Sequence, residues 1–153
     1  MIRRIAFAAG LLSLLLAATL AGLYLTNATP IVPAIAESDL DGRPYVVKMH
    51  AQWCPVCRVT KDVWSDIQTA YTGKVNLIVL DFTNDDTTRA SRAEAARLGL
   101  APLFDEYEGA TGYVVILDGR TKEVRNEIKG RRDFAEYQAA IDAAMAGAVA
   151  LTP

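Results

Sequence analysis

The apolar run Lys74–Phe82, with the sequence KVNLIVLDF, limits the possible folds more than any other part of this sequence. It has the length of a strand and is apolar almost throughout, without the strict alternation of a half-exposed strand. Such a strand has to be covered on both faces, which is typical of a parallel sheet packed between helices. We therefore expect an α/β fold in which Lys74–Phe82 is a central strand.

Helical patterns surround this run. Cys54–Tyr71 repeats apolar residues every three or four positions, so we expect one helix there. After the run, Asn84 supplies a cap for a second helix, and Gly99 ends it. A third, C-terminal helix contains Phe134 and Met145. The apolar faces are expected at Val56, Val59, Val63, Ile67 and Ala70 in the first helix and at Ala90, Ala93 and Leu98 in the second.

Three further strands complete the pattern. Tyr45–His50 and Tyr113–Leu117 are short and apolar, and Glu123–Ile128 alternates as a partner for the second of these. Asp118-Gly119 between them predicts a tight hairpin turn. The order β-α-β-α-β-β-α predicts a mixed central sheet with helices on both faces.

The N-terminus has a different character. Residues 5–36 contain no charged side chain, and Arg3 and Arg4 stand directly before them. A positive start followed by an apolar run, here Ile5–Leu25, is the pattern of an export signal. The run is long enough to span a membrane, which favours a retained anchor, while Ala34-Ile35-Ala36 offers a site for cleavage of a signal peptide. Both interpretations stay open.

These patterns divide the chain into four parts. Residues 1–25 form a signal-anchor or signal peptide, 26–40 a tether, 41–147 the folded domain and 148–153 a tail. The positive-inside rule places Arg3 and Arg4 in the cytoplasm and the folded domain on the far side of the membrane. Disulfides persist in such a compartment.

Composition excludes several classes of protein. The formal charge of −2 over 153 residues argues against nucleic acid as a partner, because nucleic-acid binders carry a basic surplus. Two cysteines are too few for a disulfide-rich scaffold or for a four-cysteine zinc site within one chain. We expect one small domain with no cofactor and no resident metal.

The two cysteines carry the chemistry. Cys54 falls where the first strand gives way to the first helix, and unpaired N–H groups at a helix start lower the pKa of a thiol. Pro55 suits the first helical position because its missing N–H costs nothing there. Cys57 lies one helical turn further on, within reach of Cys54. A thiolate that attacks and a neighbour that resolves the mixed disulfide are what thiol–disulfide exchange requires.

Other interpretations of the pair are a structural disulfide, a zinc half-site with His50 and two inert buried cysteines. A disulfide that closes so short a loop stabilises little, a zinc site needs more ligands, and inert cysteines need no strand-to-helix position. The redox pair is therefore favoured.

The segment Ala51-Gln52-Trp53-Cys54-Pro55-Val56-Cys57 resembles the A-x-W-C-x-x-C signature of the thioredoxin family. The resemblance implies a thioredoxin-like fold and a redox disulfide Cys54–Cys57, with Cys54 attacking, Cys57 resolving and Trp53 packing beside them. With the export segment, the chain is similar to membrane-tethered thioredoxin-like proteins of bacterial envelopes. That likeness implies disulfide-bearing envelope proteins as partners, a membrane electron donor, and a place at the inner membrane facing the periplasm, or in the periplasm after cleavage.

Some residues depart from the family pattern. Thr111 occupies the position of the family's cis-proline, and Gly112 beside it permits a different loop path. Lys48 replaces a buried acid on the first strand, where an ammonium would favour a nearby thiolate unless its head reaches water. Residues 101–108 form an apparent insertion, either a solvated loop or one that selects partners. For His50 we favour packing or hydrogen bonding over catalysis.

The sequence thus predicts a thiol–disulfide oxidoreductase that reduces disulfides of envelope proteins. Val56 adds no positive charge beside the cysteines, which favours a reductant. The alternatives are a disulfide oxidant or isomerase, and a metal-binding or assembly module that uses the two thiolates as ligands.

Overall fold

The computed structural model describes residues 42–150, with side chains to Gly147. The predicted signal segment 1–25 and the tether 26–40 lie outside the described residues. The predicted order of strands is confirmed. In chain order, the elements are β1 (Tyr45–His50), α2 (Pro55–Val59), α3 (Lys61–Tyr71), β2 (Asn76–Asp81), α4 (Asp85–Arg97), α5 (Ala101–Tyr107), β3 (Tyr113–Leu117), β4 (Val124–Lys129) and α6 (Phe134–Ala150).

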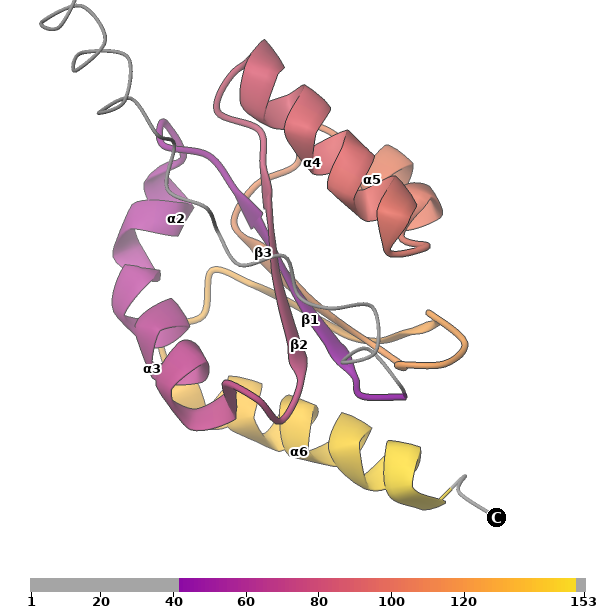
Figure 1. Ribbon diagram of the computed structural model, residues 1–153. Helices are drawn as coiled ribbons and strands as arrows, with labels where there is room; N and C mark the ends of the chain where they lie inside the picture. Colours follow the sequence, from indigo (N-terminus) through magenta and orange to yellow (C-terminus); the bar gives the residue numbers. More distant parts are fainter. Residues whose placement is uncertain (1–41, 151–153) are drawn as a thin grey trace, which may run out of the picture. The chain divides into compact units, whose positions relative to one another are not determined.

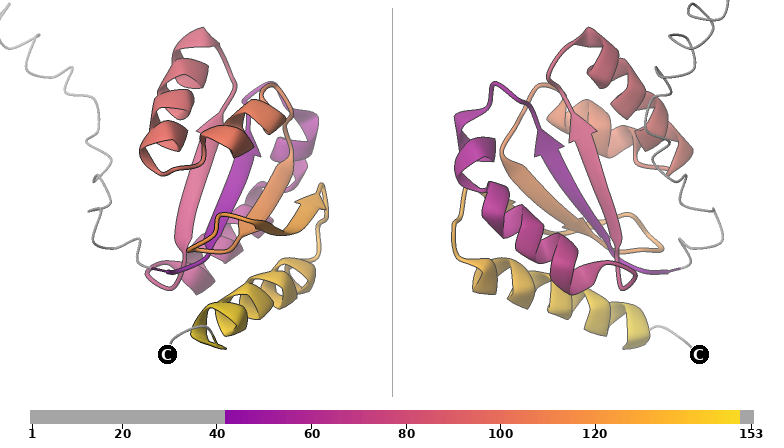
Figure 2. Two further views of the ribbon diagram at one scale, coloured as in Figure 1. Left: turned by 90° about the vertical axis from the view of Figure 1, so that its right-hand side faces the viewer. Right: turned by 60° about the vertical axis from the view of Figure 1, so that its left-hand side comes forward.

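The strands form one mixed sheet with the order β2-β1-β3-β4. Strand β1 runs parallel to β2 and antiparallel to β3, and β4 pairs antiparallel with β3. Helices α4 and α5 cover one face of the sheet, while α3 and α6 cover the other (Figures 1 and 2). The predicted α/β class with helices on both faces is therefore confirmed.

The centre of the sheet is not where the sequence placed it. Strand β2 lies at an edge of the described sheet, and β1 and β3 occupy the middle. In β2, Ile78 and Leu80 are buried toward α4 and α5, whereas Val79 between them is 43% exposed. The prediction of a strand covered on both faces was wrong because a single valine at a surface costs little, so apolar residues alone do not prove burial.

The helix expected over 54–71 is two helices. Thr60 ends α2 with φ −106° and ψ 10°, and its hydroxyl donates to the carbonyl of Val56 at 2.9 Å. This local hydrogen bond offers the backbone an alternative to a continuous helix. Val59, predicted to be buried, is 55% exposed. The break leaves α2 as a short separate unit that carries the two cysteines.

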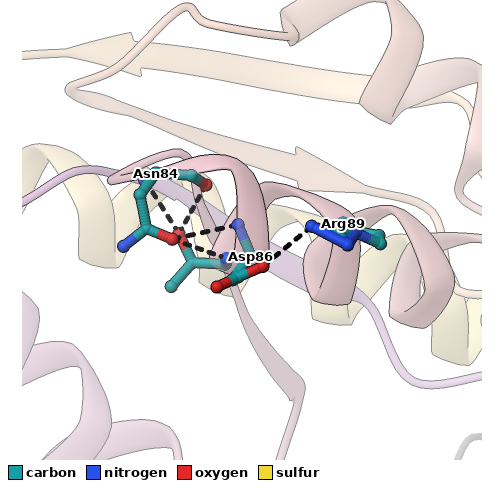
Figure 3. Close-up of polar contacts among 4 residues, drawn as sticks. Asn84, Asp86 and Arg89 are labelled. Atoms are coloured by element: carbon teal, nitrogen blue, oxygen red, sulfur yellow. Dashed lines mark hydrogen bonds and ion pairs between the residues drawn. The ribbon is translucent and has the colours of Figure 1, made fainter.

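Helix α4 begins as predicted. The Asn84 side chain accepts hydrogen bonds from the N–H groups of Asp86 and Thr87 at 3.0 and 3.1 Å, and Arg89 pairs with Asp86 at 2.8 Å (Figure 3). Its buried face differs from the predicted one: Ala90 and Ala93 are exposed. The residues of this helix and its C-cap that are buried are Ser91, Ala95 and Leu98.

The predicted insertion 101–108 is largely helix α5 rather than a loop, and its two aromatic residues belong to the core. Phe104 and Tyr107 are buried, and the ring of Phe104 packs on Phe82 with centroids 5.4 Å apart. Of its acids, Asp105 and Glu108 each pair with Arg92 of α4 at 2.7 Å. The expectation of a loop was wrong because the apolar spacing of Leu103, Phe104 and Tyr107 is that of one helical face.

The β3–β4 connection is longer than the predicted two-residue turn. It runs from 118 to 123, and the buried Asp118 carboxylate organises it. One oxygen accepts from the N–H groups of Thr121 and Arg120 at 3.0 and 2.9 Å, and the other accepts from the Arg125 guanidinium at 3.0 Å. These backbone donors and then Arg125 lower the pKa of Asp118 to about 2. Hydrogen bonds from the backbone of the loop to the Asp118 side chain therefore shape this connection, in place of the predicted tight turn.

Asp118→Asn should lower the free energy of unfolding at pH 7 by about 1–2 kcal/mol, because the N–H donors lose a charged acceptor. The folded-state pKa of Asp118 lies below that of an unfolded aspartate, so its contribution is complete above about pH 4. It is lost as the pH falls toward 2. Urea unfolding across this range checks the prediction, with the exposed Asp85→Asn as control. A gap between wild type and Asp118→Asn that stays constant down to pH 2 would refute it.

Candidate active site

Cys54 and Cys57 lie together at the start of α2, directly after the carboxyl end of β1. Cys54 is the N-cap of this helix, and its sulfur accepts the backbone N–H of Cys57 at 3.1 Å. Pro55 is the first helical residue, as the sequence predicted. Both thiols are free, and each residue is 2% exposed. The helix start therefore holds the two sulfurs on one side, facing the protein.

The surroundings shift the pKa values of the Cys54 and Cys57 thiols in opposite directions. Burial works to raise the pKa of Cys54, but hydrogen bonds from Cys57, from the Thr111 side chain and from backbone N–H groups outweigh it, so the pKa is lowered. For Cys57, burial and its hydrogen bond to the Cys54 sulfur raise the pKa. At neutral pH, Cys54 is thus the better thiolate and Cys57 the retained thiol, which is the division of labour that disulfide exchange needs.

A pair of glycines forms the wall of the site. Gly112 has φ +85°, and a Cβ there would lie 2.7 Å from Cγ1 of Val56 and 3.7 Å from the Cys54 sulfur. A Cβ on Gly130, after β4, would lie 3.1 Å from the same Val56 atom. The two loops are joined by a hydrogen bond from the N–H of Gly130 to the carbonyl of Gly112 at 3.2 Å. Gly130 was not predicted, because a glycine after a strand indicates no more than a turn.

Thr111 lies at this wall, and every peptide bond among the described residues is trans. The N–H of Gly112 donates to the carbonyl of Met49 at 2.9 Å, which fixes the loop to the end of β1. In this position the Thr111 side chain hydrogen-bonds the Cys54 sulfur. The loop therefore supplies a polar group to the thiol.

Gly112→Ala should lower the free energy of unfolding by about 2–4 kcal/mol, because it combines a left-handed backbone with a clash against Val56. Gly99→Ala is the matched control: Gly99 also has positive φ, but nothing lies within 4 Å of its added Cβ. The control should cost only about 1–2 kcal/mol. Chemical denaturation measures both, and equal losses would show that Val56 does not press on Gly112.

The other predicted site residues are placed as follows. Lys48 lies on β1, 8% exposed, with its Nζ 5.2 Å from the centre of the Trp64 ring. Trp53 is 54% exposed, and its indole N–H donates to the carbonyl of Thr83 at 3.2 Å. The tryptophan therefore anchors the loop to the end of β2 and leaves much of its ring in solvent, instead of packing fully beside the cysteines.

His50 ends β1 without the hydrogen bond that the sequence interpretation allowed. Its Nδ1 is buried and has no partner among the described residues. Burial and the neighbouring charge of Lys48 lower the pKa of His50, against an opposing effect of Asp81. The imidazole is therefore neutral at physiological pH and fills space at the end of the strand.

The described part of the chain contains neither a metal-binding cluster nor a membrane-spanning helix. Among the described residues, no three or more His, Cys, Asp or Glu side chains are grouped so as to hold a metal ion. Within 42–150, no helix combines the length and the apolar character needed to cross a membrane. The predicted anchor lies outside this part of the chain.

Thr111→Val should raise the pKa of Cys54, because valine keeps the shape of threonine but cannot hydrogen-bond the thiolate. Thr111→Ser keeps the hydroxyl and should leave the pKa close to that of the wild type. The rate of Cys54 alkylation as a function of pH measures both. Superimposable profiles for the valine and serine variants would remove Thr111 from the site.

Fold and site together define a thioredoxin-like domain with two free cysteines at the start of a helix. Residues 34–97 match the family model described as Thioredoxin. The matched segment contains both cysteines of the site together with strands β1 and β2.

Curated relatives match part of the chain. It is similar to the chloroplastic thioredoxin-like protein HCF164 of Arabidopsis thaliana, with 36% identity over 64 residues, which is 41% of this chain and 24% of that protein. The HCF164 protein of Oryza sativa subsp. japonica is 37% identical over 59 residues, covering 38% and 21%. The matched region thus spans about a quarter of these relatives.

Solved structures with a similar fold include thioredoxin O2 of Arabidopsis thaliana in its oxidised state, at 19% identity and a TM-score of 0.43. That alignment covers 69% of this chain and 83% of the other. A second is MTB DsbF in mixed oxidised and reduced forms, at 16% identity, a TM-score of 0.46 and coverage of 67% and 81%.

Proposed function

We propose that this domain reduces disulfide bonds in proteins of the bacterial envelope, with Cys54 as nucleophile and Cys57 as resolving thiol. The observation that carries the proposal is the asymmetry of the two thiols. Cys54 receives hydrogen bonds that favour its thiolate, while burial and the Cys54 sulfur hold the proton on Cys57. Two cysteines with a purely structural role would not require this difference in pKa.

The reaction balances as a two-electron exchange. The Cys54 thiolate attacks one sulfur of the partner's disulfide, a Cys54–partner S–S bond forms, and the partner's other sulfur leaves with the electron pair. The Cys57 thiolate then attacks the Cys54 sulfur, which forms the Cys54–Cys57 disulfide and frees the partner's second sulfur. The partner gains two electrons and two protons, and the domain ends oxidised.

The direction proposed is reduction. Val56, between the cysteines, is apolar and packs against Gly112 and Gly130, so the residues between Cys54 and Cys57 add no charge to the thiolate. An oxidant or isomerase is the alternative, and the reduction potential separates the two. A reduction potential of about −270 mV is typical of a reductant, and one of about −120 mV is typical of a strong oxidant.

The proposals for the location of the domain and for its partners are argued from the sequence alone. Arg3, Arg4 and the apolar run after them support attachment to the inner membrane with the domain in the periplasm, or release there after cleavage. In that setting the domain requires a membrane electron donor to reduce it again. Protease protection of intact and permeabilised cells tests this part of the proposal.

Single cysteine variants test the reaction itself. Cys57→Ser should accumulate mixed disulfides with envelope proteins, because no thiol remains to release the partner. Cys54→Ser should form none and should lose insulin-reducing activity, because the activated thiolate is gone. Non-reducing electrophoresis of alkylated samples reveals the adducts, with the double variant as the baseline. Equal trapping by both single variants would contradict the assigned roles.

A further inference from the structure

Lys48 is a buried cation whose charge no acidic side chain balances in the described structure. It lies in the middle of β1 between the register neighbours Val79 and Val114, neither of which carries charge. Across from it, α3 contributes the ring of Trp64, 5.2 Å from the ammonium. Lys48 is only 8% exposed, and no described carboxylate forms an ion pair with it.

An isolated charge in such a place is costly. The effective penalty for burying an ion is on the order of several kcal/mol, and an indole ring returns only a small part of it. The charged or titratable groups around Lys48 are Cys54 and Cys57 on α2 and His50 on its own strand. His50 is neutral at physiological pH, so a thiolate is the negative charge that these groups can offer to Lys48.

Of the two thiols, Cys57 is the one coupled more strongly to Lys48. The Cys57 side chain is buried, and its sulfur lies 3.7 Å from the carbonyl of Met49, the residue after Lys48. Burial and the Cys54 sulfur raise the pKa of Cys57, and the charge of Lys48 works against them. Burial likewise lowers the pKa of Lys48, and of the two sulfurs Cys57 opposes this lowering more than Cys54 does.

We propose that Lys48 is the buried counter-charge of the Cys57 thiolate, and that it thereby speeds release of the bound partner and favours the reduced dithiol. This inference rests on the proposed function. Lys48 is a positioning residue in this scheme, since it acts through Cys57 and not on the partner.

The release step shows why the charge matters there. In the mixed disulfide the Cys54 sulfur is bonded to the partner and carries no charge, so the Cys57 thiolate is the negative charge beside Lys48. That thiolate attacks the Cys54 sulfur, the Cys54–Cys57 bond forms, and the Cys54–partner bond breaks. The electron pair leaves with the partner's sulfur, which takes up the proton that Cys57 lost.

The charge of Lys48 also acts on the redox equilibrium. Oxidation converts both sulfurs into a neutral disulfide and leaves Lys48 buried without an opposing charge. The reduced state keeps the Cys54 thiolate near Lys48, so Lys48 stabilises the dithiol relative to the disulfide. Lys48 therefore makes this domain a weaker reductant than the same domain without the charge.

The test follows both thiols of the full chain with an aromatic disulfide reagent that releases a coloured thiolate. The first release reports attack by Cys54 and the second reports resolution by Cys57. Lys48→Met should slow the second release about tenfold, in line with a lower thiolate fraction, and leave the first within about twofold. In glutathione buffers, the equilibrium constant of this variant should shift about tenfold toward the disulfide, which is about 30 mV.

Control variants separate charge from shape. Lys48→Arg keeps the charge and should restore the second release toward the wild-type rate. Lys61→Met removes an exposed lysine at the start of α3 and should change neither quantity. Lys48→Gln supplies a second neutral side chain if the methionine variant fails to fold, although removal of a buried, uncompensated charge is expected to stabilise the fold.

The outcomes are distinct. A second release and an equilibrium constant that both stay within twofold of wild type in Lys48→Met or Lys48→Gln would overturn the inference and leave the proposed function standing. Slowing confined to the first release would assign Lys48 to Cys54 and also overturn it. A wild-type protein that shows no second release and forms no disulfide in glutathione buffers would refute the proposed function and the inference together.

Discussion

The hydrogen bond from the backbone N–H of Cys57 to the sulfur of Cys54 is the interaction on which the site depends. It makes Cys54 the N-cap of α2, so the same contact that starts the helix also stabilises a thiolate. Because Thr60 ends α2 after five residues, this short helix is placed by its contacts with the loops around it and not by its own length. This one hydrogen bond therefore contributes both to the start of the helix and to the reactivity of Cys54.

Those loop contacts explain how a short helix keeps a fixed position. Val56 fits against two glycines that lie far apart in the sequence, and Thr111 reaches the Cys54 sulfur from the same wall. Lys48, on the central strand β1, acts electrostatically on the same two thiols. Burial by itself disfavours every charged form in this region, so each hydrogen bond and each counter-charge decides which sulfur ionises.

The sequence predicted what depends on local patterns. The strand-to-helix position of the cysteines, Pro55 at the helix start and the Asn84 cap all follow from neighbouring residues, and the structure has them. It did not predict features that depend on distant contacts: Gly130 beside Val56, the exposure of Val79 at the sheet edge, and the break at Thr60. The loop expected at residues 101–108 follows from comparison with the family pattern, whereas the apolar spacing of the segment itself is helical.

The proposed mechanism depends on the difference in pKa between the two thiols, and their separate titration in the wild-type protein is its sharpest test. The pH dependence of alkylation at each cysteine, resolved by mass spectrometry of the peptides, gives both values in one experiment. We expect Cys54 to titrate below an ordinary cysteine and Cys57 above it. Two thiols that titrate together in the ordinary range of cysteine, or Cys57 ionising first, would contradict it.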